Sequence, residues 1–87
     1  MANHASAKKR IRQTIKRTAR NKDIRSRVRT YVKRVRAAVA AGDKRLAEAA
    51  LPEAIRQIEK AVVKGVYHRK TGSRYVSRLV SRVSELS

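Results

Sequence analysis

Basic side chains are the residues most able to do chemistry in this chain, and their places on a helix indicate what that chemistry is. Apolar residues between positions 24 and 39 recur at steps of three and four, the spacing that lines one helix face. They are Ile24, Val28, Tyr31, Val32, Val35 and Val39. Extended toward the N-terminus at about 100° per residue, this face reaches Arg17 and Arg10. Arginine donates paired hydrogen bonds to phosphate or carboxylate, so this part of the helix predicts an anionic partner.

The rest of the N-terminal segment supports the same prediction. Ile11 and Ile15 lie well over 90° from the apolar face. Basic residues surround them: Lys8, Lys9, Arg12, Lys16 and Arg20. We therefore expect this segment to be cationic all round, with no stripe wide enough to bury.

Net charge points to a polyanion as well. The 87-residue chain has 24 Lys or Arg and 6 Asp or Glu, a formal charge of +18. Residues 1–41 hold +13 of this charge, residues 42–65 hold +1 and residues 66–87 hold +4. Such self-repulsion works against compaction and favours a polyanionic partner, with the neutral middle segment turned away from it.

Composition excludes several classes of protein. The chain has no Cys, which rules out a disulfide scaffold or a thiolate metal site and suits a reducing cytoplasm. It also contains no run of about eighteen apolar residues, so we expect no membrane partner. Its length predicts a single domain over 1–87.

Catalysis has no support in the residue pattern. His4 and His68 are far apart, and no carboxylate pair, Cys or Gly-rich phosphate loop accompanies either. We expect no enzyme activity, small-molecule substrate, cofactor or metal, and no homo-oligomer.

Turn and cap signals divide the chain into three helices. Gly42 suits the left-handed position after a helix, and Asp43 can cap the next one. Gly65 repeats the stop signal, and Ser6 is a plausible first cap. The sequence predicts an extended tail over 1–6 and helices near 7–41, 44–64 and 68–86. With such short turns, it predicts an all-α, antiparallel three-helix bundle.

The predicted helix lengths do not match. About 35 residues give the first helix roughly 50 Å, and about 21 give the second roughly 30 Å. The first helix must therefore overhang its partners, and the overhanging part is the one without an apolar stripe.

The two later helices carry clear apolar faces and two local conflicts. The middle face holds Ala47, Ala50, Leu51, Ala54, Ile55, Ile58, Ala61 and Val62, and the last holds Val76, Leu79, Val80, Val83 and Leu86. Pro52 predicts a kink near Leu51 or a helix restart. Gly72 weakens the start of the third helix by about 1 kcal/mol.

The candidate site is a surface rather than a pocket. Two basic ridges flank the stripe of the first helix: Lys22, Arg29, Lys33 and Arg36, and Arg20, Arg27 and Arg34. On the third helix, Arg74, Arg78 and Arg82 lie beside Ser73, Ser77 and Ser81. Only Tyr67, in the second turn, is a candidate for stacking on a base. With so few aromatic platforms, recognition should depend on backbone shape and charge, which favours a folded RNA.

Several motifs together resemble a known family. They include Ser6-Ala7-Lys8-Lys9-Arg10, Arg20-Asn21-Lys22, Ala41-Gly42-Asp43, and the turn Lys64-Gly65-Val66 followed by His68. These are similar to the bacterial small-ribosomal-subunit protein S-twenty family over nearly the whole length. The resemblance implies a three-helix structural protein that binds 16S ribosomal RNA in the small subunit and helps it fold.

The resemblance also implies the contact residues. They are Ser6, Lys8, Lys9, Arg10, Lys16, Arg17, Arg20, Asn21, Lys22, His68, Arg74, Ser77 and Arg78. To these we add Arg12, Arg29, Lys33, Arg69, Lys70 and Arg82 as further basic candidates. We also expect residues 1–20 to be poorly ordered when free and to become helical on RNA.

Three alternatives come from other classes. A nucleoid protein that coats duplex DNA would have similar charge. A membrane-active cationic helix would need a bulky apolar face, which the overhang lacks. An organelle transit peptide has a similar Arg-rich start, but here the helical periodicity continues into the bundle.

Overall fold

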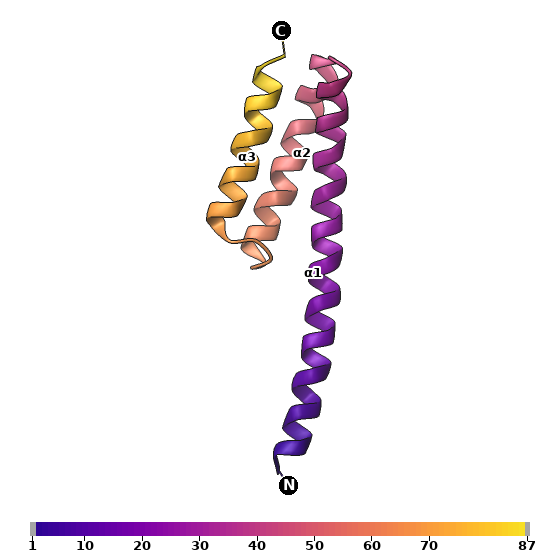
Figure 1. Ribbon diagram of the computed structural model, residues 1–87, viewed down its shortest axis with the longest axis vertical. Helices are drawn as coiled ribbons and strands as arrows, with labels where there is room; N and C mark the ends of the chain where they lie inside the picture. The colour runs from indigo at the N-terminus through magenta and orange to yellow at the C-terminus, as the bar shows by residue number, and fades with distance from the viewer. Residues whose placement is uncertain (1, 87) are drawn as a thin grey trace.

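The chain folds as an antiparallel bundle of three helices. The computed structural model describes the backbone of residues 2–86 and the side chains of residues 4–86. Within that range the helices are α1 (Ala2–Ala40), α2 (Lys44–Val63) and α3 (Arg69–Ser84), with no strand. The predicted all-α bundle with a long first helix is confirmed (Figure 1).

The first helix begins earlier than the sequence indicated. An extended tail with Ser6 as the cap is wrong for residues 2–6, because α1 is helical from Ala2 and Ser6 lies inside it. Met1, the first residue of that predicted tail, lies outside the described residues. Alanine favours the helix even without a polar cap, which explains the earlier start. The predicted ends at 41, 64 and 86 lie one or two residues beyond the observed ends at Ala40, Val63 and Ser84.

Both turns form as their residues predict. Gly42 and Gly65 adopt positive φ angles of 71° and 77°, the left-handed conformation that ends α1 and α2. The Asp43 side chain caps α2 by accepting a hydrogen bond from the backbone N–H of Leu46 at 3.0 Å. At the start of α3, His68 Nδ1 accepts from the backbone N–H of Lys70 at 3.1 Å.

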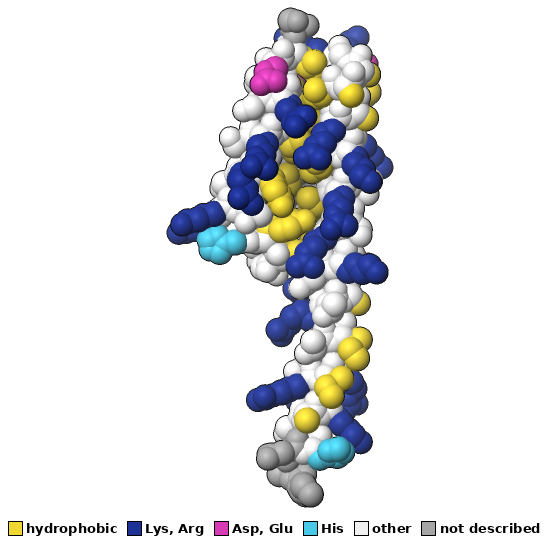
Figure 2. All heavy atoms as spheres, viewed as in Figure 1, with side chains coloured by type: hydrophobic (Ala, Val, Ile, Leu, Met, Phe, Trp, Pro, Cys, Tyr) yellow, Lys and Arg dark blue, Asp and Glu magenta, His cyan; other side chains and the backbone are white. Residues whose placement is uncertain are grey.

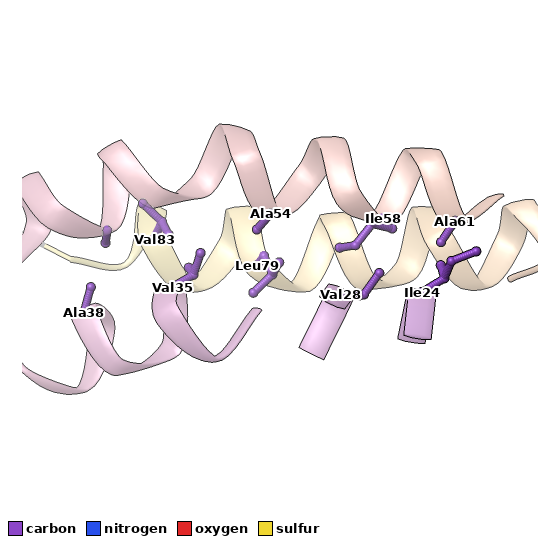
Figure 3. Packing of buried hydrophobic residues seen from close by; sticks show 10 residues of the cluster. Ile24, Val28, Val35, Ala38, Ala54, Ile58, Ala61, Leu79 and Val83 are labelled. Atoms are coloured by element: carbon purple, nitrogen blue, oxygen red, sulfur yellow. The ribbon is translucent and has the colours of Figure 1, made fainter. Parts of the chain in front are cut away.

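The core is small and rich in alanine and valine. From α1 it buries Ile24, Val28, Val35 and Ala38; from α2, Ala47, Ala54, Ile58 and Ala61; and from α3, Leu79 and Val83 (Figure 3). Small side chains let α1 and α2 approach closely. Val80 is an exception to the predicted face, because it is 39% exposed and α3 instead turns Gly72 and Tyr75 inward.

The two local conflicts in the sequence have different outcomes. Pro52 is exposed within a continuous α2, so a helix restart there is wrong. Gly72 is buried against α2, where an added Cβ would collide with Cγ2 of Val62. The glycine that weakens α3 locally therefore allows α3 to approach α2 closely.

The N-terminal part of α1, up to Arg20, extends beyond the other two helices and determines the molecular shape. We call this part of α1 the overhang. The molecule measures 66 × 21 × 14 Å, and α2 and α3 flank only the C-terminal part of α1 (Figure 1). Every residue from His4 to Arg20 is exposed, and the first buried residue of α1 is Ile24. The mismatch in helix length predicted from the sequence is confirmed.

Candidate nucleic-acid interface

The overhang holds the first group of predicted contact residues. It carries Ser6, Lys8, Lys9, Arg10, Arg12, Lys16 and Arg17, all exposed. Ile11 and Ile15 are 59% and 62% exposed, so they pack on no part of the bundle. The overhang is not uniformly cationic, because hydrophobic side chains form an exposed line along one side of it (Figure 2).

A second group gathers where α1 leaves the bundle. The turn between α2 and α3 lies at this end of the bundle (Figure 1). It brings His68, Arg69 and Lys70 to the same end as Arg20, Asn21 and Lys22. Arg20 is held there, since its Nη2 donates to the backbone oxygen of Lys64 at 3.3 Å.

The third group borders a groove between α1 and α3, which we call the α1–α3 groove. Five arginines line it: Arg25, Arg29, Arg36, Arg78 and Arg82. Its other lining residues are Val28, Val32, Leu79, Tyr67 and Tyr75. Figure 2 shows this arrangement as a hydrophobic band between two rows of basic side chains.

The predicted residues are unevenly represented in this groove. Arg29, Arg78 and Arg82 line it, whereas Lys33 and Ser77 are exposed on the same helices but do not. Arg74 stacks over the ring of Tyr75, with its Cζ 5.8 Å from the ring centroid. The predicted contact residues therefore extend along α1 and onto α3, and only some of them line the groove.

Arg25 is absent from the basic surface predicted from the sequence, and Arg36 lies on a predicted ridge but is not among the predicted contacts. Arg25 and Arg36 lie at helical spacing from Arg29, on the edge of the apolar stripe that faces α3. The sequence alone predicts a basic ridge there and does not tell which helix the ridge faces. Knowing the position of α3 is what selects these two residues.

Tyr67 and Tyr75 form one end of the groove. Their rings meet edge to face, with centroids 5.6 Å apart and planes at 83°. Burial and the neighbouring Tyr75 raise the pKa of Tyr67, against the opposing effect of Arg25 and Arg29. Tyr67 is therefore a neutral phenol at physiological pH and can donate a hydrogen bond.

The protein itself neutralises almost none of this charge. Across residues 4–86 the one ion pair joins Arg56 and Glu53 at 3.7 Å, on the exposed side of α2. No acidic side chain lines the α1–α3 groove. Among the described residues, the charges on the overhang and along the groove therefore have no ion-pair partner within the protein.

Other kinds of site have no counterpart in the described residues. There, no group of His, Cys, Asp and Glu could hold a metal ion. None of the described helices is both long and apolar enough to cross a membrane.

The fold and the charge distribution define a small, strongly basic helical protein with an extended cationic surface. The family model for ribosomal protein S20 matches residues 2–84, so the chain belongs to that family. Members of this family are structural components rather than enzymes.

Curated relatives are similar to this chain over nearly its full length. The small ribosomal subunit protein bS20 of Geotalea daltonii is 58% identical over 87 residues, covering 100% of both chains. The protein of the same name from Maricaulis maris is 55% identical over 87 residues, covering 100% of this chain and 99% of the relative. The bS20 protein of Paramagnetospirillum magneticum is 55% identical over 86 residues, covering 99% and 96%.

Proposed function

We propose that this protein is a structural constituent of the small ribosomal subunit that binds 16S ribosomal RNA directly and stabilises its folded form. The observation that carries the proposal is the overhang, an exposed cationic helix segment that forms no ion pair with the described residues of the protein. Phosphates would neutralise it, and helical RNA presents them on several sides of such a rod. The bS20 relatives are named for the same subunit.

The contact residues bind RNA phosphates at many points along the protein surface rather than in one pocket. Arg10 and Arg17 bind phosphates on the helix face that continues the buried stripe of α1, and Lys8, Arg12 and Lys16 bind them on the opposite side of the helix. Ile11 and Ile15, which lie between these basic side chains, can pack on the apolar faces of riboses. His68, Arg69 and Lys70 extend the surface at the root of the overhang.

Stabilisation follows from where these charges lie. A single helix that spans both bundle and overhang can contact RNA segments that are far apart in the RNA chain. Neutralising phosphates between those segments lowers their mutual repulsion and favours the folded RNA. The protein would act through the ribosome in the cytoplasm, with no substrate turned over.

Competition binding tests the proposal. Full-length protein is titrated against a 16S transcript and against duplex DNA of equal length, at salt concentrations from 50 to 200 mM. We expect tighter binding to the transcript and, for six to ten phosphate contacts, roughly a thousandfold or greater loss of affinity across that range. Equal affinity for duplex DNA would favour the nucleoid alternative, and a flat salt response would remove the phosphate argument.

A further inference from the structure

The α1–α3 groove differs chemically from the rest of the basic surface. The overhang presents charge on a convex rod, whereas the groove is a hollow of about 540 Å³. This volume falls in the range of about 300–1,000 Å³ typical of sites for small organic groups. The hollow suits a nucleotide-sized group and is too small to enclose a whole duplex.

The groove also offers two kinds of surface at once. Val28, Val32 and Leu79 form an apolar floor, and Tyr67 with Tyr75 adds aromatic surface at one end. Guanidinium groups stand on both sides, Arg25, Arg29 and Arg36 from α1 and Arg78 and Arg82 from α3. An apolar floor accepts a base that has left its stack, and the arginines accept the phosphates before and after it.

Charge decides between the available occupants. A second copy of this chain, itself at +18, would bring repulsion to five unneutralised arginines. An acidic helix of another protein would also match the charge, but the paired tyrosine rings at one end favour the flat face of a base. We propose that the α1–α3 groove binds one unpaired nucleotide of RNA, with its base on the floor beside Tyr67 and Tyr75 and its flanking phosphates on the arginines.

This inference rests on the proposed function for the identity of the polymer, and it adds a preference for an RNA element. A perfectly paired helix cannot place a base in the groove without losing its pairing. A bulged nucleotide is already unpaired, so it enters at lower cost. The protein should therefore prefer duplex RNA that carries a bulge.

Two RNA hairpins test this, identical except that one carries a single unpaired uridine. We expect the full-length protein to bind the bulged hairpin several-fold to about a hundredfold more tightly, the range that one base–aromatic stack provides. The double variant Arg25→Gln/Arg78→Gln should lose most of that preference. The matched variant Arg45→Gln/Lys60→Gln, with the same loss of charge away from the groove, should keep it.

Crosslinking of the unmodified protein gives an answer that does not depend on any variant folding. The bulged uridine is replaced by 5-iodouridine, and the complex is irradiated and digested. We expect the attached peptide to contain Tyr67 or Tyr75. The inference would be overturned by crosslinking to the overhang or by equal affinity for the two hairpins. It would also be overturned if both double variants lost the same preference. Displacement of the bulged hairpin by an acidic amphipathic peptide that binds more tightly would overturn it as well.

The two proposals fail in different ways. The 16S transcript and duplex DNA are measured with the same protein samples. If the protein binds the transcript more tightly than duplex DNA but binds both hairpins equally, only the groove inference is contradicted. If it shows neither preference, the proposed function is contradicted.

Discussion

Arg20 of α1 binds the end of α2: its Nη2 donates a hydrogen bond to the backbone oxygen of Lys64 at 3.3 Å. Lys64 is the C-terminal cap of α2, where unpaired carbonyls leave a partial negative charge. The next residue, Asn21, is half-buried, and every residue from His4 to Ala19 is exposed. This contact therefore marks the point at which α1 leaves the bundle.

The Arg20 contact predicts a boundary in stability along α1. Replacing Arg20 with Ala should lower the free energy of unfolding, by less than about 1 kcal/mol because the bond is exposed to solvent. Arg17→Ala, one turn earlier, removes the same charge from a residue with no described hydrogen bond. This change should leave the free energy of unfolding unchanged. Urea unfolding of both variants measures the difference. Equal losses would mean that the bundle extends further along α1.

The overhang should contribute to binding and not to the stability of the bundle. Ile11→Ala/Ile15→Ala should leave the thermal midpoint nearly unchanged, since both side chains are exposed. Ile58→Ala, at a position with 0% exposure, should cost about 2–5 kcal/mol. Calorimetry of the two variants checks this. A large loss from the Ile11/Ile15 pair would show that this face packs on protein.

The same division should appear for the charged face. Arg10→Ala/Arg17→Ala should weaken binding to the 16S transcript because two phosphate contacts are lost, and reduce the salt slope by about two. The unfolding midpoint of the free protein should not move. A drop in that midpoint without a change in affinity would contradict the assignment.

Local signals in the sequence predicted most of the fold. Gly42, Asp43 and Gly65 located both turns, because each has a conformation or a cap that few other residues provide. Helical periodicity gave the buried face of α1, and comparison of helix lengths gave the overhang. The start of α1 was missed because Ser6 can cap a helix but also fits inside one.

The remaining errors come from contacts between helices. Val80 belongs to the apolar series of α3 but is exposed, because the close approach of α2 at Gly72 sets the rotation of α3. The groove escaped prediction for the same reason, since Arg25 and Arg36 become a site only when α3 lies beside them. Periodicity gives the faces of a helix and does not give their partners.

Gly72 offers a direct test of this packing. Gly72→Ala gains about 1 kcal/mol of helix propensity but forces a Cβ into Val62, a branched and stiff side chain, at a cost of about 1–3 kcal/mol. We expect a net loss of stability. In a Val62→Ala background the collision disappears, so the same change should stabilise the protein. Chemical denaturation of all four combinations measures the coupling, and additive effects would exclude the collision.

Tyr67 should ionise at a higher pH than a free tyrosine. Burial and Tyr75 raise its pKa above the usual 10.0, so the folded state holds the phenol proton more tightly than the unfolded state. The stability that this provides is complete below pH 10 and is lost as the pH rises through the raised pKa. Ultraviolet absorbance of phenolate, compared between the protein and Tyr67→Phe, should show that the substitution removes an ionisation above pH 10. Removal of an ionisation at or below pH 10 would contradict the assignment.

The last prediction concerns the order of the overhang. Its helix packs on nothing, has no acidic residue in its first turn to match the helix dipole, and repeats like charges at four-residue spacing, as in Lys8, Arg12 and Lys16. Short helices without tertiary contacts are marginal in water. We therefore expect backbone amides of residues 5–19 to exchange rapidly in the free protein and to become protected on the 16S transcript, while those around Ile58 stay protected throughout. Hydrogen exchange read by mass spectrometry measures both states. Strong protection of residues 5–19 without RNA would show instead that the overhang is an ordered helix before it binds. Binding would then carry no entropic cost for ordering this helix.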